Sequence, residues 1–142
     1  MVDSSNTWTL VSLMPELQVV RFTQPSLCEL TDRGLFDQML DDLLVRTGKG
    51  GVVVLNFQQV VAFDSCFLAS LIRAYKRYEK LGAKFVACHL CDDVRMVLMV
   101  AGNKQPLDYM LNYVDNEEQA VAKAKKLLRT VDDGSGAQTD GK

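Results

Sequence analysis

The sequence has no long hydrophobic run and no cluster of basic residues. Its most apolar stretch, Met96 to Gly102, is far shorter than the roughly 20 residues that a membrane-spanning helix needs. The segment that begins at Met1 lacks the positive flank and the apolar core of a secretion signal. Sixteen Lys and Arg against eighteen Asp and Glu give a net charge of −2. Duplex nucleic acid and anionic membranes require a basic surface, so we expect neither as a partner, and we expect a cytoplasmic protein.

The sequence has one histidine and few residues at the spacing of metal ligands. With His89 as the one histidine and no nucleophile elbow, the parts of a Ser-His-Asp hydrolase are missing, and we expect neither an enzyme nor a cofactor. Cys88 and Cys91 have the spacing of a zinc knuckle or a dithiol, but structural zinc needs four ligands, and the other two cysteines each stand alone. We favour cysteines that fill the core. A thiol oxidoreductase that uses Cys88 and Cys91 is the less favoured alternative.

What is present is the composition of an ordinary globular domain, with 48% hydrophobic residues in 142. This length buries one core rather than two, so we expect a single domain over residues 1–131 and a disordered polar tail over 132–142. Apolar runs and helical spacing predict the order ββαβαβαβα, an α/β fold with a mostly parallel sheet and an opening hairpin. The expected strands are 8–13, 18–22, 51–57, 84–90 and 110–114, and the expected helices are 31–48, 65–81, 92–101 and 116–131.

The glycines of Thr47-Gly-Lys-Gly-Gly51 invite comparison with a phosphate-binding loop. That motif follows a strand and opens a helix, so that amide groups point at the phosphate. Here the glycines follow a predicted helix and open a predicted strand. The order of elements therefore favours a turn that ends the helix at Gly48.

The residue pair Asp64-Ser65 lies where the loop after the central strand enters the second predicted helix. Both residue types are common N-caps, and capping alone would explain their presence. Helical spacing predicts that an apolar face containing Leu71 turns inward and that Ser70 lies on the exposed face. The residues expected on the exposed face are Cys66, Ala69, Ser70, Arg73, Arg77 and Lys80.

The segment from Val53 to Leu98 resembles the STAS domain of bacterial anti-sigma-factor antagonists. That family has an apolar strand ending in Asp or Asn, a short loop and then Asp-Ser-(Ser/Thr)-Gly-Leu at a helix start. Here the strand ends at Asn56, and Asp64-Ser65-Cys66-Phe67-Leu68 opens the helix. The sequence Leu81-Gly-Ala-Lys-Phe-Val-Ala87 resembles the second half of the family pattern.

The resemblance implies a STAS-like mixed sheet with about four helices and a phosphorylation site at Ser65. It also implies a non-enzymatic regulator that binds an anti-sigma factor or serine kinase, and possibly other STAS proteins. Cys66 and Phe67 depart from the family pattern, as does the segment 23–26, so a constitutive stressosome-like scaffold subunit stays as an alternative. The residues expected at the partner surface are Asn56, Asp64, Ser65, Cys66, Phe67, Ala69, Ser70, Arg73 and Arg77.

Overall fold

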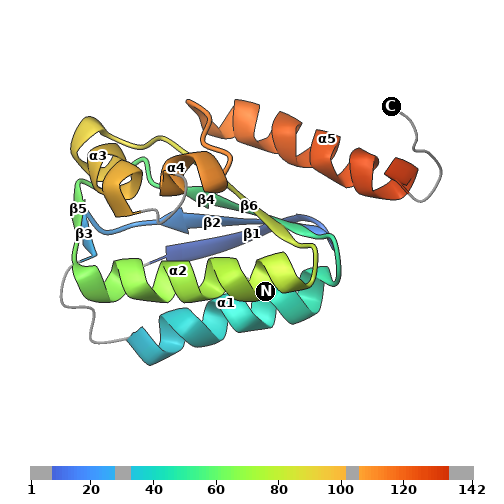
Figure 1. Ribbon diagram of the computed structural model, residues 1–142, viewed down its shortest axis with the longest axis horizontal. Helices are drawn as coiled ribbons and strands as arrows, with labels where there is room; N and C mark the ends of the chain where they lie inside the picture. Colours follow the sequence, from blue (N-terminus) through green and yellow to red (C-terminus); the bar gives the residue numbers. More distant parts are fainter. Residues whose placement is uncertain (1–7, 28–32, 102–105, 135–142) are drawn as a thin grey trace.

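A four-stranded sheet forms the middle layer of the computed structural model, which describes residues 8–27, 33–101 and 106–134 (Figure 1). Two helices, α1 and α2, lie on one side of the sheet, and α5 crosses the other side. None of the described helices is both long enough and apolar enough to cross a lipid bilayer. In chain order the elements are β1 (Trp8–Met14), β2 (Leu17–Phe22), β3 (Ser26–Leu27), α1 (Arg33–Thr47), β4 (Val52–Asn56), β5 (Ala62–Phe63), α2 (Ser65–Lys80), β6 (Lys84–Cys88), α3 (Asp92–Ala101), α4 (Leu107–Met110) and α5 (Glu117–Gly134).

The strand order in the main sheet is β1-β2-β4-β6. β1 and β2 form the expected antiparallel hairpin, while β2, β4 and β6 run parallel to one another. Parallel neighbours need crossover connections, and α1 and α2 supply them on the same face of the sheet. The predicted α/β class, with a mixed and mostly parallel sheet, is confirmed.

Strand β4 is buried on both faces, as its unbroken apolar run predicts. Val53 and Leu55 belong to the larger core cluster on the side of α1 and α2. Val52 and Val54 belong to a smaller cluster that includes Ala120 of α5. Because side chains alternate along a strand, one short segment anchors both layers of helices.

Several helix ends match their sequence signals. Gly48 has a φ of +74° and donates its N–H to Leu44 O at 3.0 Å, so the glycine segment ends α1 as expected. Asn116 caps α5, because its Oδ1 accepts the N–H of Gln119 at 2.9 Å. The expected start of the first helix, at residue 31, lies outside the described residues.

Three local predictions are wrong. The segment 110–114 was expected to be a strand, but α4 and a turn occupy most of it, and only Val114 forms an isolated parallel bridge to Cys88. No strand was expected between the predicted strand 51–57 and the predicted helix 65–81, but β5 lies there and pairs with β3. Helix α5 continues to Gly134, beyond the expected start of the tail at 132, and residues 135–142 lie outside the described part of the chain.

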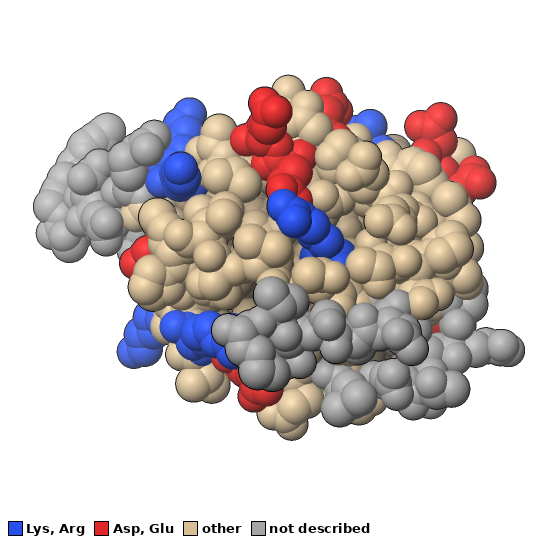
Figure 2. All heavy atoms as spheres, turned by 180° about the vertical axis from the view of Figure 1, so that it is seen from behind, with Lys and Arg blue, Asp and Glu red and all other residues tan. Residues whose placement is uncertain are grey.

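Charged side chains are scattered over the face seen from behind (Figure 2). Acidic and basic side chains meet near the middle of this face, with broad uncharged areas on both sides. No continuous basic patch covers the described part of this face.

The buried Tyr78 hydroxyl links α2 to α1 by donating to Leu40 O at 2.6 Å. We expect Tyr78→Phe to lower the free energy of unfolding by about 1 kcal/mol, because a buried hydrogen bond is lost while the ring packing stays. Urea denaturation measures the change. Tyr75→Phe is the matched control on the same helix, where the hydroxyl bonds to exposed Glu79 at 3.3 Å, and we expect less than about 0.5 kcal/mol there. Equal losses in the two variants would contradict the assigned role of Tyr78.

Candidate functional site

Ser65 is the first residue of α2 and is exposed. Asp64 precedes it in an extended conformation, with φ −102° and ψ 179°. The Asp64 Oδ1 accepts the backbone N–H of Phe67 at 2.9 Å, which makes Asp64 the N-cap. The cap fixes where the helix begins, so the Ser65 hydroxyl is presented at a helix entrance, as the sequence predicted.

The loop that leads into Ser65 is held by the chain that follows β2. Pro25 O accepts the N–H groups of Val61 and Ala62, at 2.7 and 3.2 Å. Directly beyond these contacts, β3 and β5 pair in parallel over two residues. Segment 23–26, where the sequence departs from the family pattern, therefore supports the loop before Ser65.

Phe67 points into the core rather than toward a partner. Its side chain is 1% exposed, and its ring lies 4.8 Å from Phe36, 5.7 Å from Phe22 and 5.2 Å from Phe63, measured between ring centroids. This placement corrects the expectation that Phe67 lies at the partner surface. Phe67, which replaces the family glycine, therefore fills space inside the molecule and adds no bulk to the surface beside Ser65.

The inward face of α2 differs from the predicted one. Ser70 is 1% exposed, which corrects its expected place on the outer face, and its Oγ accepts a hydrogen bond from Arg73 at 3.1 Å. A small side chain whose hydroxyl is hydrogen-bonded can be buried at low cost, and hydrophobic spacing gives no sign of it. The buried residues of α2 are Phe67, Ser70, Leu71, Ala74 and Tyr78.

The two arginines of the outer face already have partners on α1. Arg73 lies 3.5 Å from Asp37 Oδ2, and Arg77 Nε donates to Asp41 Oδ1 at 2.8 Å. A hollow of about 350 Å³ lies beside the first of these pairs, and Cys66 also borders it. Cys66 and Ala69 are exposed, as expected for the outer face.

Asn56 supports the site from below rather than lining its surface. The side chain is 5% exposed, with Nδ2 donating to Glu117 Oε1 at 2.8 Å and Oδ1 accepting the N–H of Gln58 at 2.8 Å. Asn56 therefore joins the end of β4 to the start of α5 and turns the chain into the next loop. This burial corrects the expectation that Asn56 lies at the partner surface.

Arg21 completes the junction between α5 and the sheet. Its Nε and Nη2 donate to the two carboxylate oxygens of Glu117, at 2.9 and 2.7 Å. These hydrogen bonds lower the pKa of Glu117 below its usual value, against the opposing effect of partial burial. We call Arg21, Asn56 and Glu117 the α5 clasp. Glu117 is an acidic residue in the first turn of α5, but the sequence gives no sign of its pairing with Arg21, because the two residues lie 96 positions apart.

The two cysteines with dithiol spacing belong to different packing environments. Cys88 is fully buried in the cluster under α5, whereas Cys91 is half-buried against the larger core. Burial, reinforced by the nearby Glu117 charge, raises the pKa of the Cys88 thiol to about 12. The neighbouring His89 accepts the N–H of Glu117 through Nε2 at 3.3 Å. Cys88 therefore has the setting of a core-filling thiol, not of a reactive thiolate.

The STAS domain profile matches residues 32–120. SpoIIAA, an anti-sigma factor antagonist in its unphosphorylated form, has a TM-score of 0.66 at 15% identity, covering 84% of this chain and 96% of its own. A STAS domain protein from Planctomyces limnophilus gives 0.68 at 18% identity, with 82% and 96% covered. A variant of RsbS from Moorella thermoacetica gives 0.66 at 21% identity, with 84% and 96% covered. No match is found among curated protein sequences.

These likenesses show a shared α/β fold. The family profile covers more than half of the 142 residues and includes the Asp64-Ser65 helix entrance. This chain belongs to the STAS domain family.

The α5 clasp makes the free energy of unfolding depend on pH in the acidic range. Because folding lowers the pKa of Glu117, the clasp stabilises the native state fully above the ordinary value of 4.5 and loses this effect as pH falls through the folded value. We expect Glu117→Gln to cost about 1 kcal/mol at pH 7, since Arg21 is half-exposed and solvent screens the pair. Urea unfolding at a series of pH values should show this difference shrinking below pH 4.5. Glu118→Gln, which removes an exposed carboxylate from the same turn and leaves the clasp residues in place, is the control, and a constant difference for Glu117→Gln would contradict the assignment.

Thiol labelling compares two cysteine environments in one chain. Near neutral pH we expect an alkylating reagent to modify exposed Cys66 much faster than Cys88, which is buried and has a raised pKa. Peptide mass spectrometry after timed quenching measures each site separately. Fast modification of Cys88 in the native protein, matching the rate in urea, would show a reactive thiol and restore the oxidoreductase alternative.

Proposed function

We propose that this STAS domain is a non-enzymatic, cytoplasmic protein-binding module that docks on an anti-sigma factor or serine kinase and dissociates when Ser65 is phosphorylated. The observation that carries the proposal is the exposed hydroxyl of Ser65 at the entrance of α2, next to its cap Asp64. SpoIIAA, which shares the fold, is known in unphosphorylated and phosphorylated forms. The Moorella thermoacetica RsbS variant carries glutamate in place of a serine.

The local structure can accept a phosphate at Ser65 without rearranging. The first turn of a helix presents backbone N–H groups and the positive end of the helix dipole, both of which favour an anion. Phe67, not Ser65, holds this turn in the core, so the modified hydroxyl has no packing role to lose. The fold therefore supports a switch that acts at the surface.

Charge alone is enough to separate the partners. A phosphate adds about −1.5 to −2 charges. Facing an acidic group of the partner about 6 Å away, two added charges cost roughly 1.4 kcal/mol in bulk water and about 5.5 at an effective dielectric of 20. These energies correspond to about tenfold to ten-thousandfold in affinity.

The docking surface proposed here is the exposed part of the α2 entrance and outer face. Ser65, Cys66 and Ala69 are directly accessible, and Arg73 is exposed while paired with Asp37. Phe67 is buried and cannot contact a partner, so its replacement of glycine does not favour the constitutive scaffold over the switch. Cys66 is the departure from the family pattern that a partner would meet directly.

The switch is tested with the full chain and three variants. We expect Ser65→Ala to retain the partner in a pull-down from the source cell. Ser65→Asp adds one negative charge, about half of the charge that phosphate adds, so we expect it to weaken binding about threefold to hundredfold, as titration calorimetry with the captured partner would measure. Incubation with that partner and ATP should phosphorylate Ser65 and give a larger loss, because phosphate adds more charge than aspartate.

The control is Ala122→Glu, which adds the same charge on exposed α5, across the sheet from α2. We expect it to bind like the unmodified chain. Binding that Ser65→Asp leaves intact, together with the absence of phosphate on Ser65, would refute the switch. Weakening by both variants would show a general charge effect and would equally count against Ser65 as the switch.

A further inference from the structure

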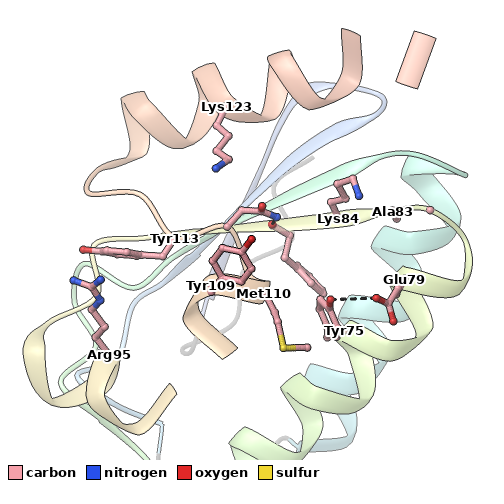
Figure 3. Close-up of a pocket in the computed structure, with 12 residues that line it drawn as sticks. Tyr75, Glu79, Ala83, Lys84, Arg95, Tyr109, Met110, Tyr113 and Lys123 are labelled. Carbon is pink, nitrogen blue, oxygen red and sulfur yellow. Dashed lines mark hydrogen bonds between the residues drawn. The ribbon is translucent and has the colours of Figure 1, made fainter. Parts of the chain in front are cut away.

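A cavity opens beside the outer edge of β6, away from the α2 entrance (Figure 3). The second half of this edge is covered by chain, because Ala87 N donates to Leu111 O and Ala87 O accepts from Val114 N, both at 2.9 Å. The first half is covered by one side chain, since Asn112 Nδ2 donates to Phe85 O at 2.9 Å. A strand would have filled this space, but α4 and the following turn leave a hollow of about 510 Å³.

The volume of the cavity suits a small molecule. Ligand sites in proteins commonly enclose about 300–1,000 Å³ and lie where several elements converge. Here α2, β6, α3, α4 and α5 all contribute lining residues. Their side chains come from both layers around the sheet edge, so their arrangement depends on the fold as a whole.

The charged lining favours an anion. Lys84, Arg95 and Lys123 border the cavity, against one carboxylate, Glu79, which accepts the Tyr75 hydroxyl at 3.3 Å. Lys84 and Lys123 form no ion pair with any residue in the described part of the chain. Lys123 points from α5 into the cavity (Figure 3). Positive charge is thus concentrated here in a chain whose net charge is −2.

The aromatic lining favours a flat group. Three tyrosines contribute to the cavity wall, and the guanidinium of Arg95 already lies over the ring of Tyr113, 4.6 Å from its centroid. Tyr109 is 65% exposed and projects into the same space from α4 (Figure 3). An exposed ring beside cationic side chains can stack on a planar ligand while the cations bind its charged group.

We propose that this cavity binds a small molecule made of a flat aromatic ring and one anionic group, with the ring on Tyr109 and the anion between Lys84 and Lys123. The anionic group is a phosphate or a carboxylate. The site is separate from Ser65 and needs no phosphorylation, so it would give this STAS domain a second, small-molecule input.

The test titrates the full ¹⁵N-labelled chain with defined probes and follows its backbone resonances. Adenosine 5′-monophosphate represents a ring with phosphate, and 4-hydroxybenzoate represents a ring with carboxylate. We expect at least one to shift the resonances of Ala83, Phe85 and Asn112 saturably at millimolar concentration. Adenosine and ribose 5-phosphate, each lacking one half of the ligand, should bind at least tenfold more weakly than the monophosphate if phosphate is the preferred anion.

Paired lysine variants show whether the probes bind in this cavity. We expect Lys84→Gln combined with Lys123→Gln to weaken the better probe at least tenfold, and Tyr109→Ala to weaken it severalfold. The control combines Lys76→Gln with Lys125→Gln, two exposed lysines on α2 and α5 outside the cavity wall, and should change affinity less than twofold. No saturable shift with either probe, or equal losses in both lysine pairs, would overturn the proposal.

Discussion

The burial of Phe67 determines how helix α2 is oriented, and the presentation of Ser65 follows from that orientation. The Phe67 ring contacts Phe22, Phe36 and Phe63, so its removal from the core would cost about 3–5 kcal/mol. Successive helix residues are 100° apart, so a residue two positions before an inward side chain faces away from the core. With Phe67 inward and Asp64 capping the first turn, Ser65 has to lie at the surface.

A second anchor acts at the carboxyl ends of the parallel strands. The α5 clasp joins β2 and β4 to the first turn of α5 through Arg21, Asn56 and Glu117, and Asn56 also shapes the turn that begins the loop toward Ser65. This loop is therefore fixed at its start by Asn56, in its middle by Pro25 and at its end by Asp64. Such a loop can change its surface charge without needing a new conformation, and a rigid scaffold is the usual support for functional loops.

The sequence predicted most of the fold because local signals and tertiary packing agree there. The apolar run of β4 is buried on both faces, and Asp64 caps α2, as their patterns indicate. The failures occur where long-range contacts decide the outcome. Segment 110–114 has apolar residues suited to a strand, yet only Val114 pairs with β6. Ser70 is buried because Arg73 satisfies its hydroxyl, and the clasp joins residues far apart in the chain, so neither could be predicted from spacing.

Replacing the family glycine by Phe67 and a hydroxyl by Cys66 has two physically different consequences. Phe67 is inside, so it strengthens the attachment of the first turn of α2 and is invisible to a docking protein. Cys66 is outside, next to Ser65, so it replaces a hydroxyl with a weakly polar thiol on the surface proposed for docking. Specificity is a difference between affinities for competing partners. Under the proposed function, the discrimination of this chain from its relatives therefore lies at Cys66 and the outer face of α2, while Phe67 keeps that face in a fixed position.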